Sequence, residues 1–228
     1  MTAPAVEAWE LGRRYGRRWA LGGVSFSLPA GCVAMLVGRN GSGKSTLLRV
    51  LATAIRPDHG TARLAGHDVR GERQEVRRRV ALLDHHSYHY EALTARENLR
   101  VAASFLGGLE AERAETLLAR VGLGSRADDP VSSFSAGMRK RLALARVLLQ
   151  DAEVVLLDEP YGELDPPGFR LLDQLIDELR GRGRTVVMAT HLVERGRASC
   201  DRALALADGL LAWSGPACEV PEDAGGAA

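Results

Sequence analysis

Several features are scarce in this chain of 228 residues, and each scarcity excludes a class of protein. Its three cysteines, Cys32, Cys200 and Cys218, form no C-x-x-C pair, which favours a reducing compartment over a disulfide framework. No apolar run approaches the roughly 18–20 residues that span a bilayer. Glu7 and Glu10 lie where a signal peptide has its apolar core. We therefore expect that the chain does not cross a membrane by itself.

Net charge is also scarce, because 30 basic and 29 acidic residues leave only +1. So small a charge provides no field to hold a nucleic acid, and the arginine clusters at 13–18 and 77–79 are typical of solvated faces. We expect no nucleic-acid partner. Lysine and asparagine are rarer still, since only Lys44, Lys140, Asn40 and Asn98 occur. That one of each falls in a single loop indicates that the loop needs them.

This loop follows the apolar run 33–37 and matches the phosphate-binding pattern G-x-x-x-x-G-K-[S/T]. In that pattern a strand ends, glycines let the backbone wrap a polyphosphate, and a helix begins with its N–H groups toward the anion. Lys44 supplies a charge to the β- and γ-phosphates, and the Ser45 hydroxyl supplies a ligand for Mg²⁺. The nucleotide-binding residues that we predict here are Gly38, Arg39, Asn40, Gly41, Ser42, Gly43, Lys44, Ser45 and Thr46.

A second apolar strand, at 153–157, runs into the carboxylates of Asp158 and Glu159. Ligands of a parallel sheet bind at the carboxyl ends of its strands, so this pair should lie beside the phosphate loop. One acid there can hold Mg²⁺, and the next can polarise an attacking water. Strands often end in acids, and the pair becomes informative only together with the loop.

The hydrophobic pattern predicts an α/β fold. Alternation near residues 6–9 and 24–28 predicts short antiparallel strands, and 61–70 a short hairpin. Leu47, Leu48, Leu51 and Ile55 share one face of the helix after the loop. Further strands and helices then alternate, which predicts a mostly parallel sheet with helices on both faces. The expected strands are 33–37, 80–83, 153–157, 185–189 and 203–207, and the expected helices of this part are 168–180 and 191–199.

The middle of the chain is helical. Thr94 and Glu97 form a capping-box pair, and three helices follow before Gln150. We interpret residues 88–150 as a helical lobe inserted into a single domain, 1–214. Residues 215–228 are rich in Gly, Ala and Pro, and we expect a flexible tail there.

The last of these helices, expected at 138–149, follows a serine turn that contains Ser135 and Gly137. Such a turn at a helix N-terminus can bind an anion through its backbone amides, although taken alone it is an ordinary N-cap. His191 directly follows an apolar strand, where the ligands of a sheet bind.

The loop 38–46, the turn 134–138, the pair Asp158-Glu159, the pair Leu164-Asp165 and His191 occur in this order. Together they resemble the ATP-binding subunit of ABC transporters over roughly residues 5–214. The resemblance implies a P-loop NTPase core with an N-terminal antiparallel β subdomain and an inserted helical lobe. It implies ATP and Mg²⁺ as cofactors, a homodimer in the ATP-bound state, and an integral membrane transporter subunit as partner. It also implies a cytoplasmic location on the inner face of the cell membrane.

The resemblance assigns roles within one chain. Tyr15 would stack on adenine, with Trp19 as the alternative. Asp158 would serve the metal, Glu159 would be the general base, and His191 would contact the γ-phosphate.

It also assigns roles across a dimer, which explains why one small chain would need a second copy. Ser135 and Gly137 would cap the γ-phosphate of the nucleotide held by the partner subunit. Asp165 would relay between the two subunits.

Two departures from the family pattern are present. The signature turn of the family usually reads Leu-Ser-Gly-Gly-Gln, whereas here Ala136 replaces a glycine and Met138 replaces the glutamine. Met138 followed by Arg139 resembles a branch of exporters of the drug, polysaccharide and haem type. The glutamine that usually follows strand 80–83 is replaced by His85 or His86. The run Asp84-His85-His86 is similar to the haem exporter ATPase of cytochrome c maturation. We expect His85 to bond the attacking water or the γ-phosphate, since imidazole is a poor ligand for Mg²⁺.

Other functions were weighed against an ATPase that drives an exporter. A soluble ABC-type ATPase acting on ribosomes or DNA ends stays open, although this chain has neither a second cassette nor long heptads. A GTPase would need an Asn-Lys-x-Asp motif to recognise guanine, and neither asparagine of this chain is followed by a lysine. A small-molecule kinase would leave the turn at Ser135 unexplained.

Overall fold

The main sheet of the molecule is largely parallel. In the computed structural model, which describes residues 3–85, 88–106 and 111–225, its strand order is β10-β9-β3-β8-β7-β6. All neighbouring pairs are parallel except β9 and β10, which form an antiparallel hairpin at the edge. The strands are β3 Val33–Val37, β6 Val80–Leu83, β7 Val154–Asp158, β8 Thr185–Ala189, β9 Arg202–Ala207 and β10 Leu210–Pro216.

The three central strands are buried along their whole length. Every residue of β3, β7 and β8 is buried, as expected for continuous Val, Leu, Met and Ala runs with a layer on each face. The sequence predicted five of the six strands to within a residue. It missed β10, Leu210–Pro216, because this strand is half-exposed and its last two residues fall in the expected tail.

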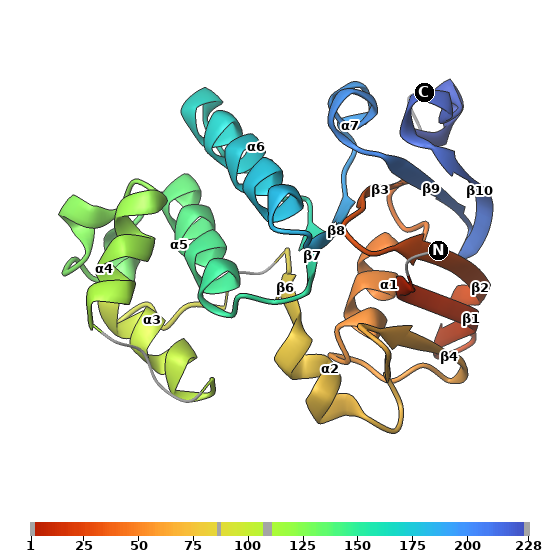
Figure 1. Cartoon of the computed structure of the whole chain (residues 1–228), viewed down its shortest axis with the longest axis horizontal. Helices are drawn as coiled ribbons and strands as arrows, with labels where there is room; N and C mark the ends of the chain where they lie inside the picture. The colour runs from red at the N-terminus through yellow and green to blue at the C-terminus, as the bar shows by residue number, and fades with distance from the viewer. Residues whose placement is uncertain (1–2, 86–87, 107–110, 226–228) are drawn as a thin grey trace.

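A second, antiparallel sheet covers one side of this core, with the order β2-β1-β4-β5. Figure 1 shows it at the opposite end of the molecule from the helical lobe. Its strands are β1 Pro4–Tyr15, β2 Arg18–Pro29, β4 His59–Leu64 and β5 His67–Asp68. β1 and β2 have 12 residues each, longer than the short strands we predicted. Bulges interrupt their pairing and with it the alternation on which the prediction depended.

Helix α1, Lys44–Leu51, lies between the two sheets. Its buried leucines form one hydrophobic cluster with Val6 and Leu11 of β1 and with Ala34 and Leu36 of β3. The helix ends earlier than predicted, because Thr53 takes a positive φ of 58° and the chain turns. Ile55 therefore lies beyond the helix. A further short helix, α2 Arg73–Arg79, was not predicted.

The other face of the parallel sheet is covered by α6, Pro166–Gly181, and α7, Val193–Ser199. Leu172 and Ile176 of α6 pack with Val33 and Val186, while Val193 of α7 packs with the cluster of Met35 and Val37. Because Ala34 and Leu36 face α1 and their odd-numbered neighbours face away from it, helices cover both faces. The predicted α/β class is confirmed.

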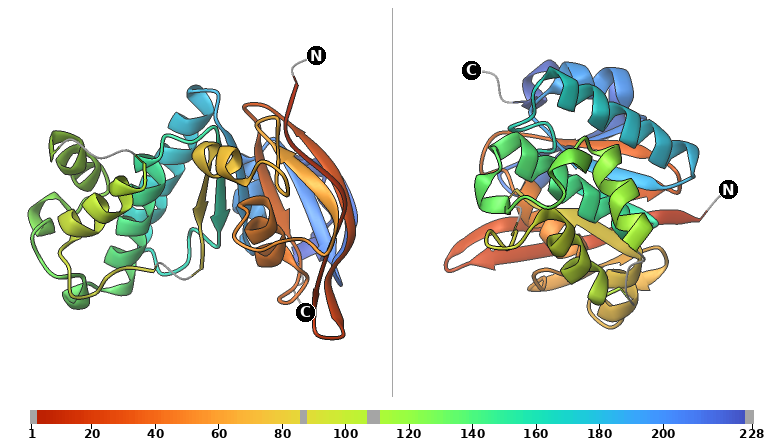
Figure 2. Two further views of the ribbon diagram at one scale, coloured as in Figure 1. Left: turned by 90° about the horizontal axis from the view of Figure 1, so that it is seen from below. Right: turned by 90° about the vertical axis from the view of Figure 1, so that its left-hand side faces the viewer.

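The helical lobe consists of α3 Ala95–Ser104, α4 Ala111–Arg120 and α5 Ala136–Leu149. The predicted capping box at the start of α3 is present, with the Thr94 hydroxyl accepting from the Glu97 N–H. Leu99, Leu118 and Leu142, one from each helix, are fully buried in a shared core. In the left view of Figure 2 these helices lie together at one end of the molecule, on the side of β6, the edge strand of the main sheet.

The C-terminal segment is folded where the structure describes it. Short 3₁₀ turns at Ala217–Glu219 and Glu222–Gly225 follow β10, and Ala217 and Val220 are buried against Met35. The structure thus differs from the flexible tail expected at 215–228, because small apolar residues also fit under a neighbouring helix. Among the described residues, no helix is long and apolar enough to cross a membrane.

Candidate active site

The phosphate loop joins β3 to α1, and two of its glycines are required by close backbone approaches. Gly38 has φ 145°, and a Cβ there would lie 2.2 Å from the carbonyl oxygen of Leu206. Gly43 has φ 108°, and a Cβ there would lie 2.5 Å from the carbonyl oxygen of Ala20. Any larger residue would push the loop away from β9 and β2. These glycines therefore fix the loop where the amides of α1 begin.

Lys44 is buried at the first position of α1. Its ammonium donates to the carbonyl oxygens of Gly38 at 2.7 Å and Arg39 at 3.1 Å. Burial lowers the pKa of Lys44, and the carboxylates of Glu159 and Asp158 oppose that shift. The ammonium is thus preplaced inside the loop, with the two acids predicted from the sequence beside it.

A cavity of about 460 Å³ opens over this loop. It brings together most of the residues that the sequence selected from four separate segments. Its lining is Tyr15, Arg18, Ala20, Asn40, Gly41, Gly43, Lys44, Ser45, Thr46, His85, Asp158 and Glu159. Of the two aromatic candidates, Tyr15 lines the cavity, whereas Trp19 packs edge-on against His59 at 5.2 Å between ring centroids.

Asp158 ends β7 and is a buried carboxylate. Neither of its oxygens has a hydrogen-bond partner of good geometry among the described residues. Burial raises the pKa of Asp158, Asp84 and Glu159 add to this effect, and the nearby Ser45 hydroxyl opposes it. A buried acid without a partner, beside a hydroxyl and a phosphate loop, offers the oxygen donors that Mg²⁺ prefers. Within the described part, no group of three or more His, Cys, Asp or Glu side chains could hold a metal alone.

Glu159 lines the cavity and pairs with His191, which is not itself among the lining residues. The Nδ1 atom of His191 lies 2.8 Å from Oε2 of Glu159. Glu159 has a positive φ of 45°, and its N–H donates to the carbonyl oxygen of Ala189 at 3.0 Å. This strained turn aims the carboxylate across to the end of β8. His191 lies in the loop before α7 rather than in the predicted helix 191–199, and its side chain is 65% exposed.

His85 lines the same cavity from the end of β6. Its backbone N–H donates to Asp84 at 2.7 Å, and Arg49 of α1 binds the same carboxylate with bonds of 2.8 and 3.0 Å. The Asp84 carboxylate is therefore engaged and holds the start of this segment in place. The alternative residue His86 lies outside the described residues.

Ser135, Gly137 and Asp165 are not part of the cavity. Ser135 is exposed and caps α5, where its hydroxyl accepts from the Met138 N–H at 3.2 Å. Asp165 caps α6, accepting from Gly168 at 2.9 Å, and pairs with Arg141 at 2.6 Å. The Arg141 guanidinium is the main cause of the lowered pKa of Asp165. Within one chain, the cavity is therefore lined by the phosphate loop and the two acids but not by the Ser135–Gly137 turn.

The sequence reasoning missed Arg18, which lines the cavity beside Asn40 and Gly41. We assigned the arginines at 13–18 to a solvated face. The signal was available in the spacing, since Tyr15 and Arg18 pair directly across the tip of the β1–β2 hairpin. Because Tyr15 was predicted to stack on the base, Arg18, its partner across the hairpin, could have been expected at the same site.

Fold and cavity together define a P-loop nucleoside triphosphatase: a glycine loop after a central parallel strand, with an acid-ended strand nearby. A family model described as "ABC transporter" matches residues 21–162. A daunorubicin resistance ATP-binding protein of Streptomyces coeruleorubidus is 38% identical over 99% of this chain and 72% of its own length. A Nod factor export ATP-binding protein of Burkholderia orbicola is 34% identical, with 92% and 70% covered.

Solved structures agree. An ATP-binding subunit of an ABC transporter matches with a TM-score of 0.86 and 27% identity, covering 93% of this chain and 90% of its own. A dimeric cassette described as a post-hydrolysis state with ADP and Pi matches with a TM-score of 0.86 and 25% identity, covering 93% and 98%. The chain belongs to the ABC transporter family. It is an ATP-binding subunit with the ATPase cassette of that family.

Proposed function

We propose that the protein supplies the energy of ATP hydrolysis to an exporter, through a separate membrane subunit, and works as a head-to-tail pair of chains. Export is supported by the relatives, one named for daunorubicin resistance and another for Nod factor export. The single observation that carries the hydrolytic part is the 2.8 Å contact between Glu159 and His191 beside the phosphate loop. The substrate class is that of small molecules moved out of the cell.

In this proposal Glu159 is the general base. Its carboxylate is aimed by the strained backbone at position 159, and the imidazole of His191 holds it at the cavity. The second ring nitrogen of His191, Nε2, then contacts the γ-phosphate. Lys44 moves from the loop carbonyls to the phosphates, Tyr15 stacks on adenine, and Arg18 lies close enough to join them. His85, from the end of β6, bonds the attacking water.

The residues fit Mg²⁺ on chemical grounds. Ser45 and Asp158 would supply two oxygen ligands, and the Asp158 carboxylate has no other hydrogen-bond partner of good geometry among the described residues. These two side chains do not fill the coordination shell of the ion, and phosphate oxygens of the nucleotide would supply further ligands. When bound, the ion neutralises charge on the transferred phosphoryl group.

A second copy of the chain would complete each site. Ser135 is exposed at the N-terminus of α5, outside the cavity of its own chain. A helix N-terminus and its amides favour an anion, so the turn suits the γ-phosphate held by a partner. Asp165, on the adjoining loop, would then lie between the two sites.

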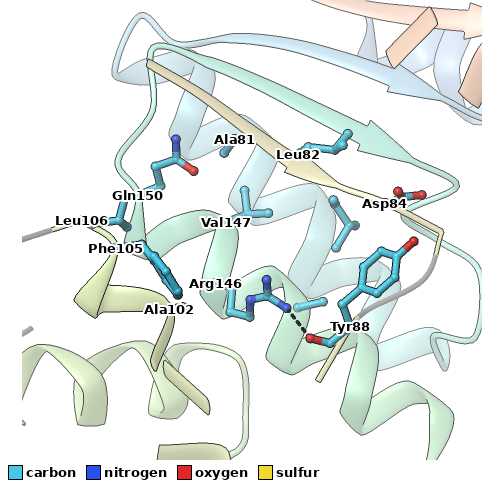
Figure 3. A pocket seen from close by; sticks show the side chains of 12 residues that line it. Ala81, Leu82, Asp84, Tyr88, Ala102, Phe105, Leu106, Arg146, Val147 and Gln150 are labelled. Carbon is cyan, nitrogen blue, oxygen red and sulfur yellow. Dashed lines mark hydrogen bonds between the residues drawn. The ribbon is translucent and has the colours of Figure 1, made fainter. Parts of the chain in front are cut away.

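The membrane partner would dock where the lobe meets the sheet edge. Figure 3 shows a groove of about 270 Å³ between β6 and α5, with Tyr88 at one end and Phe105 and Leu106 at the other. Phe105 is 82% exposed and Tyr88 68%, the most exposed large apolar side chains described. Such aromatic groups suit a protein contact. Docked in this way, they would hold the chain on the inner face of the membrane.

Crosslinking tests this arrangement. Tyr88→Cys and Glu219→Cys, placed separately in a background with the three native cysteines replaced, should differ when the chain is expressed with its membrane subunit. We expect efficient crosslinks from position 88 and weak ones from position 219, which lies in the C-terminal turns. Efficient crosslinks from 219 alone, or from neither position, would contradict the proposed surface.

A further inference from the structure

Of the 30 lysines and arginines in the chain, only Lys44 and Lys140 are lysines. Both are buried. Lys44 is 8% exposed and Lys140 is 5% exposed. The phosphate loop accounts for Lys44, but nothing described above uses Lys140. A buried ammonium is unfavourable unless acids compensate it, so its surroundings should reveal its purpose.

Helix periodicity fixes the direction of Lys140. Residues three or four apart share a helix face, so Lys140 lies on the same face of α5 as Gly137, Ala143 and Val147. A Cβ at position 137 would lie 2.9 Å from the carbonyl oxygen of Glu163, so this end of the face abuts the loop after β7. Ala143 and Val147 line the groove against β6 (Figure 3). Lys140 therefore points between that loop and the end of β6.

Acids are concentrated at that place. β6 and β7 pair with Leu83 opposite Leu157, so the next residues, Asp84 and Asp158, end neighbouring parallel strands side by side. Glu163 lies on the loop that leaves β7. The carboxylate of Asp158 has no hydrogen-bond partner of good geometry among the described residues.

The electrostatics agree with this geometry. Burial lowers the pKa of Lys140, and four carboxylates oppose the shift, in the order Glu163, Asp158, Glu159 and Asp84. Asp158 and Glu159 also act on Lys44. The same pair of acids therefore acts on both lysines, one in the core helix and one in the lobe.

The contacts on both sides of Lys140 fix its helix to the same loop. Arg141 pairs with Asp165 at 2.6 Å, and the carbonyl oxygen of Arg139 lies 2.9 Å from Nε2 of His89. The first turns of α5 are therefore anchored on the loop after β7 and on the segment after β6. The side chain at position 140 is therefore held at a fixed position relative to these two segments.

We propose that Lys140 is a positioning residue for ATP hydrolysis. Its ammonium ties the acidic strand ends and Glu163 to the first turns of α5. Glu159, which serves the nucleotide of its own chain, and the Ser135–Gly137 turn, which meets the nucleotide of the partner, are thereby held in one fixed relation. The inference rests on the proposed function, in which Glu159 is the base. A compact ammonium suits this role, because it can face several carboxylates as a point charge.

Two substitutions separate charge from packing. Lys140→Met keeps the length and apolar stem but removes the charge, whereas Lys140→Arg keeps the charge in a bulkier group. We expect Lys140→Met to lower kcat by about 10²-fold, as small misplacements in active sites do, with KM for ATP nearly unchanged. We expect Lys140→Arg to retain most of kcat. A packing role predicts the reverse order, with Met tolerated and Arg harmful, and that order would overturn the inference.

The neighbouring charge provides a second variant should Lys140→Met fail to fold. Lys140→Met combined with Glu163→Gln removes the buried ammonium together with the charge of the exposed acid that acts on it most strongly. This double variant should fold, bind ATP normally and show the same loss of kcat. Wild-type kcat in the folded double variant would contradict the inference. Glu159→Gln, assayed in parallel, separates the two proposals: if it is inactive while Lys140→Met is normal, only the role of Lys140 fails, and if it is active, the proposed base fails.

Discussion

The sheet core and the helical lobe carry different halves of the chemistry. In the core, Tyr15, Lys44, Asp158 and Glu159 reach one cavity although they are far apart in sequence. In the lobe, Ser135 caps α5 and does not line that cavity. In the function proposed above, the core alone binds a nucleotide, whereas turnover needs the lobe of another chain. Variants in the two regions should therefore fail in different ways.

The largest effect is expected in the core, at the base. Glu159→Gln should bind ATP normally and lower turnover by about 10²–10⁴-fold, because the amide cannot accept the proton of the attacking water. Steady-state ATPase and equilibrium nucleotide binding measure the two quantities. Glu178→Gln, an exposed acid of α6 that pairs with Arg120, is the matched control and should be normal. Near-normal turnover of Glu159→Gln would remove Glu159 from its role.

The next largest effect is expected in the lobe. Ser135→Arg should abolish ATP-dependent pairing by placing bulk and charge at the γ-phosphate contact, while the exposed position leaves folding intact. Sedimentation in the Glu159→Gln background, with and without ATP, tests this. Ser132→Arg, an exposed site three residues earlier, is the control. Pairing that survives Ser135→Arg would mean that the turn lies outside the interface.

A smaller effect is expected from the core lysine. Lys44→Ala should weaken ATP binding by about 10–100-fold, which corresponds to the roughly 1.5–3 kcal/mol of a charge-assisted hydrogen bond. The loss should appear in a single chain, without pairing, since Lys44 and the loop belong to one cavity. Equilibrium binding of fluorescent ATP at low protein concentration measures it. Unchanged affinity would place the phosphates elsewhere.

The smallest effect is a change of stability confined to the lobe. Thr94→Ala removes the capping bond of α3 and should lower the free energy of unfolding by about 1 kcal/mol. ATP affinity should stay unchanged, because α3 does not line the cavity. Denaturant unfolding and nucleotide binding on the same sample test both statements. A parallel loss of affinity would show that lobe and core are more tightly linked than the comparison implies.

The sequence predicted most of the core and less of its surroundings. The buried strands β3, β7 and β8 were found because continuous apolar runs have few alternatives, and the glycines and acids at their ends followed from chemistry. β1 and β2 were predicted too short, since bulges break the alternation. The C-terminal turns were missed because the burial of Ala217 depends on Met35, which is distant in sequence. Arg18 was missed because we assigned its arginine cluster to a solvated face, although the hairpin spacing pairs Arg18 with Tyr15.

The site was predictable as a set of residues but not as a geometry. Spacing selected Glu159 and His191, yet only the positive φ of Glu159 explains how they come within 2.8 Å. Spacing also selected Ser135, but whether it joins the cavity of its own chain depends on how the lobe is placed. Lys140 stood out by rarity, while its purpose depends on the acids that the fold gathers around it.

Complementation tests most directly the claim that each chain carries half of two sites. Lys44→Ala, which should bind ATP weakly, and Ser135→Arg, which should not pair with itself, are mixed before ATP is added at a concentration that Lys44→Ala does not bind. In a mixed pair one site carries both defects, and the other combines an intact phosphate loop with an intact serine turn. We expect ATPase activity well above the sum of the two variants measured separately. Activity equal to that sum, at protein concentrations where the wild-type chain pairs, would contradict this claim.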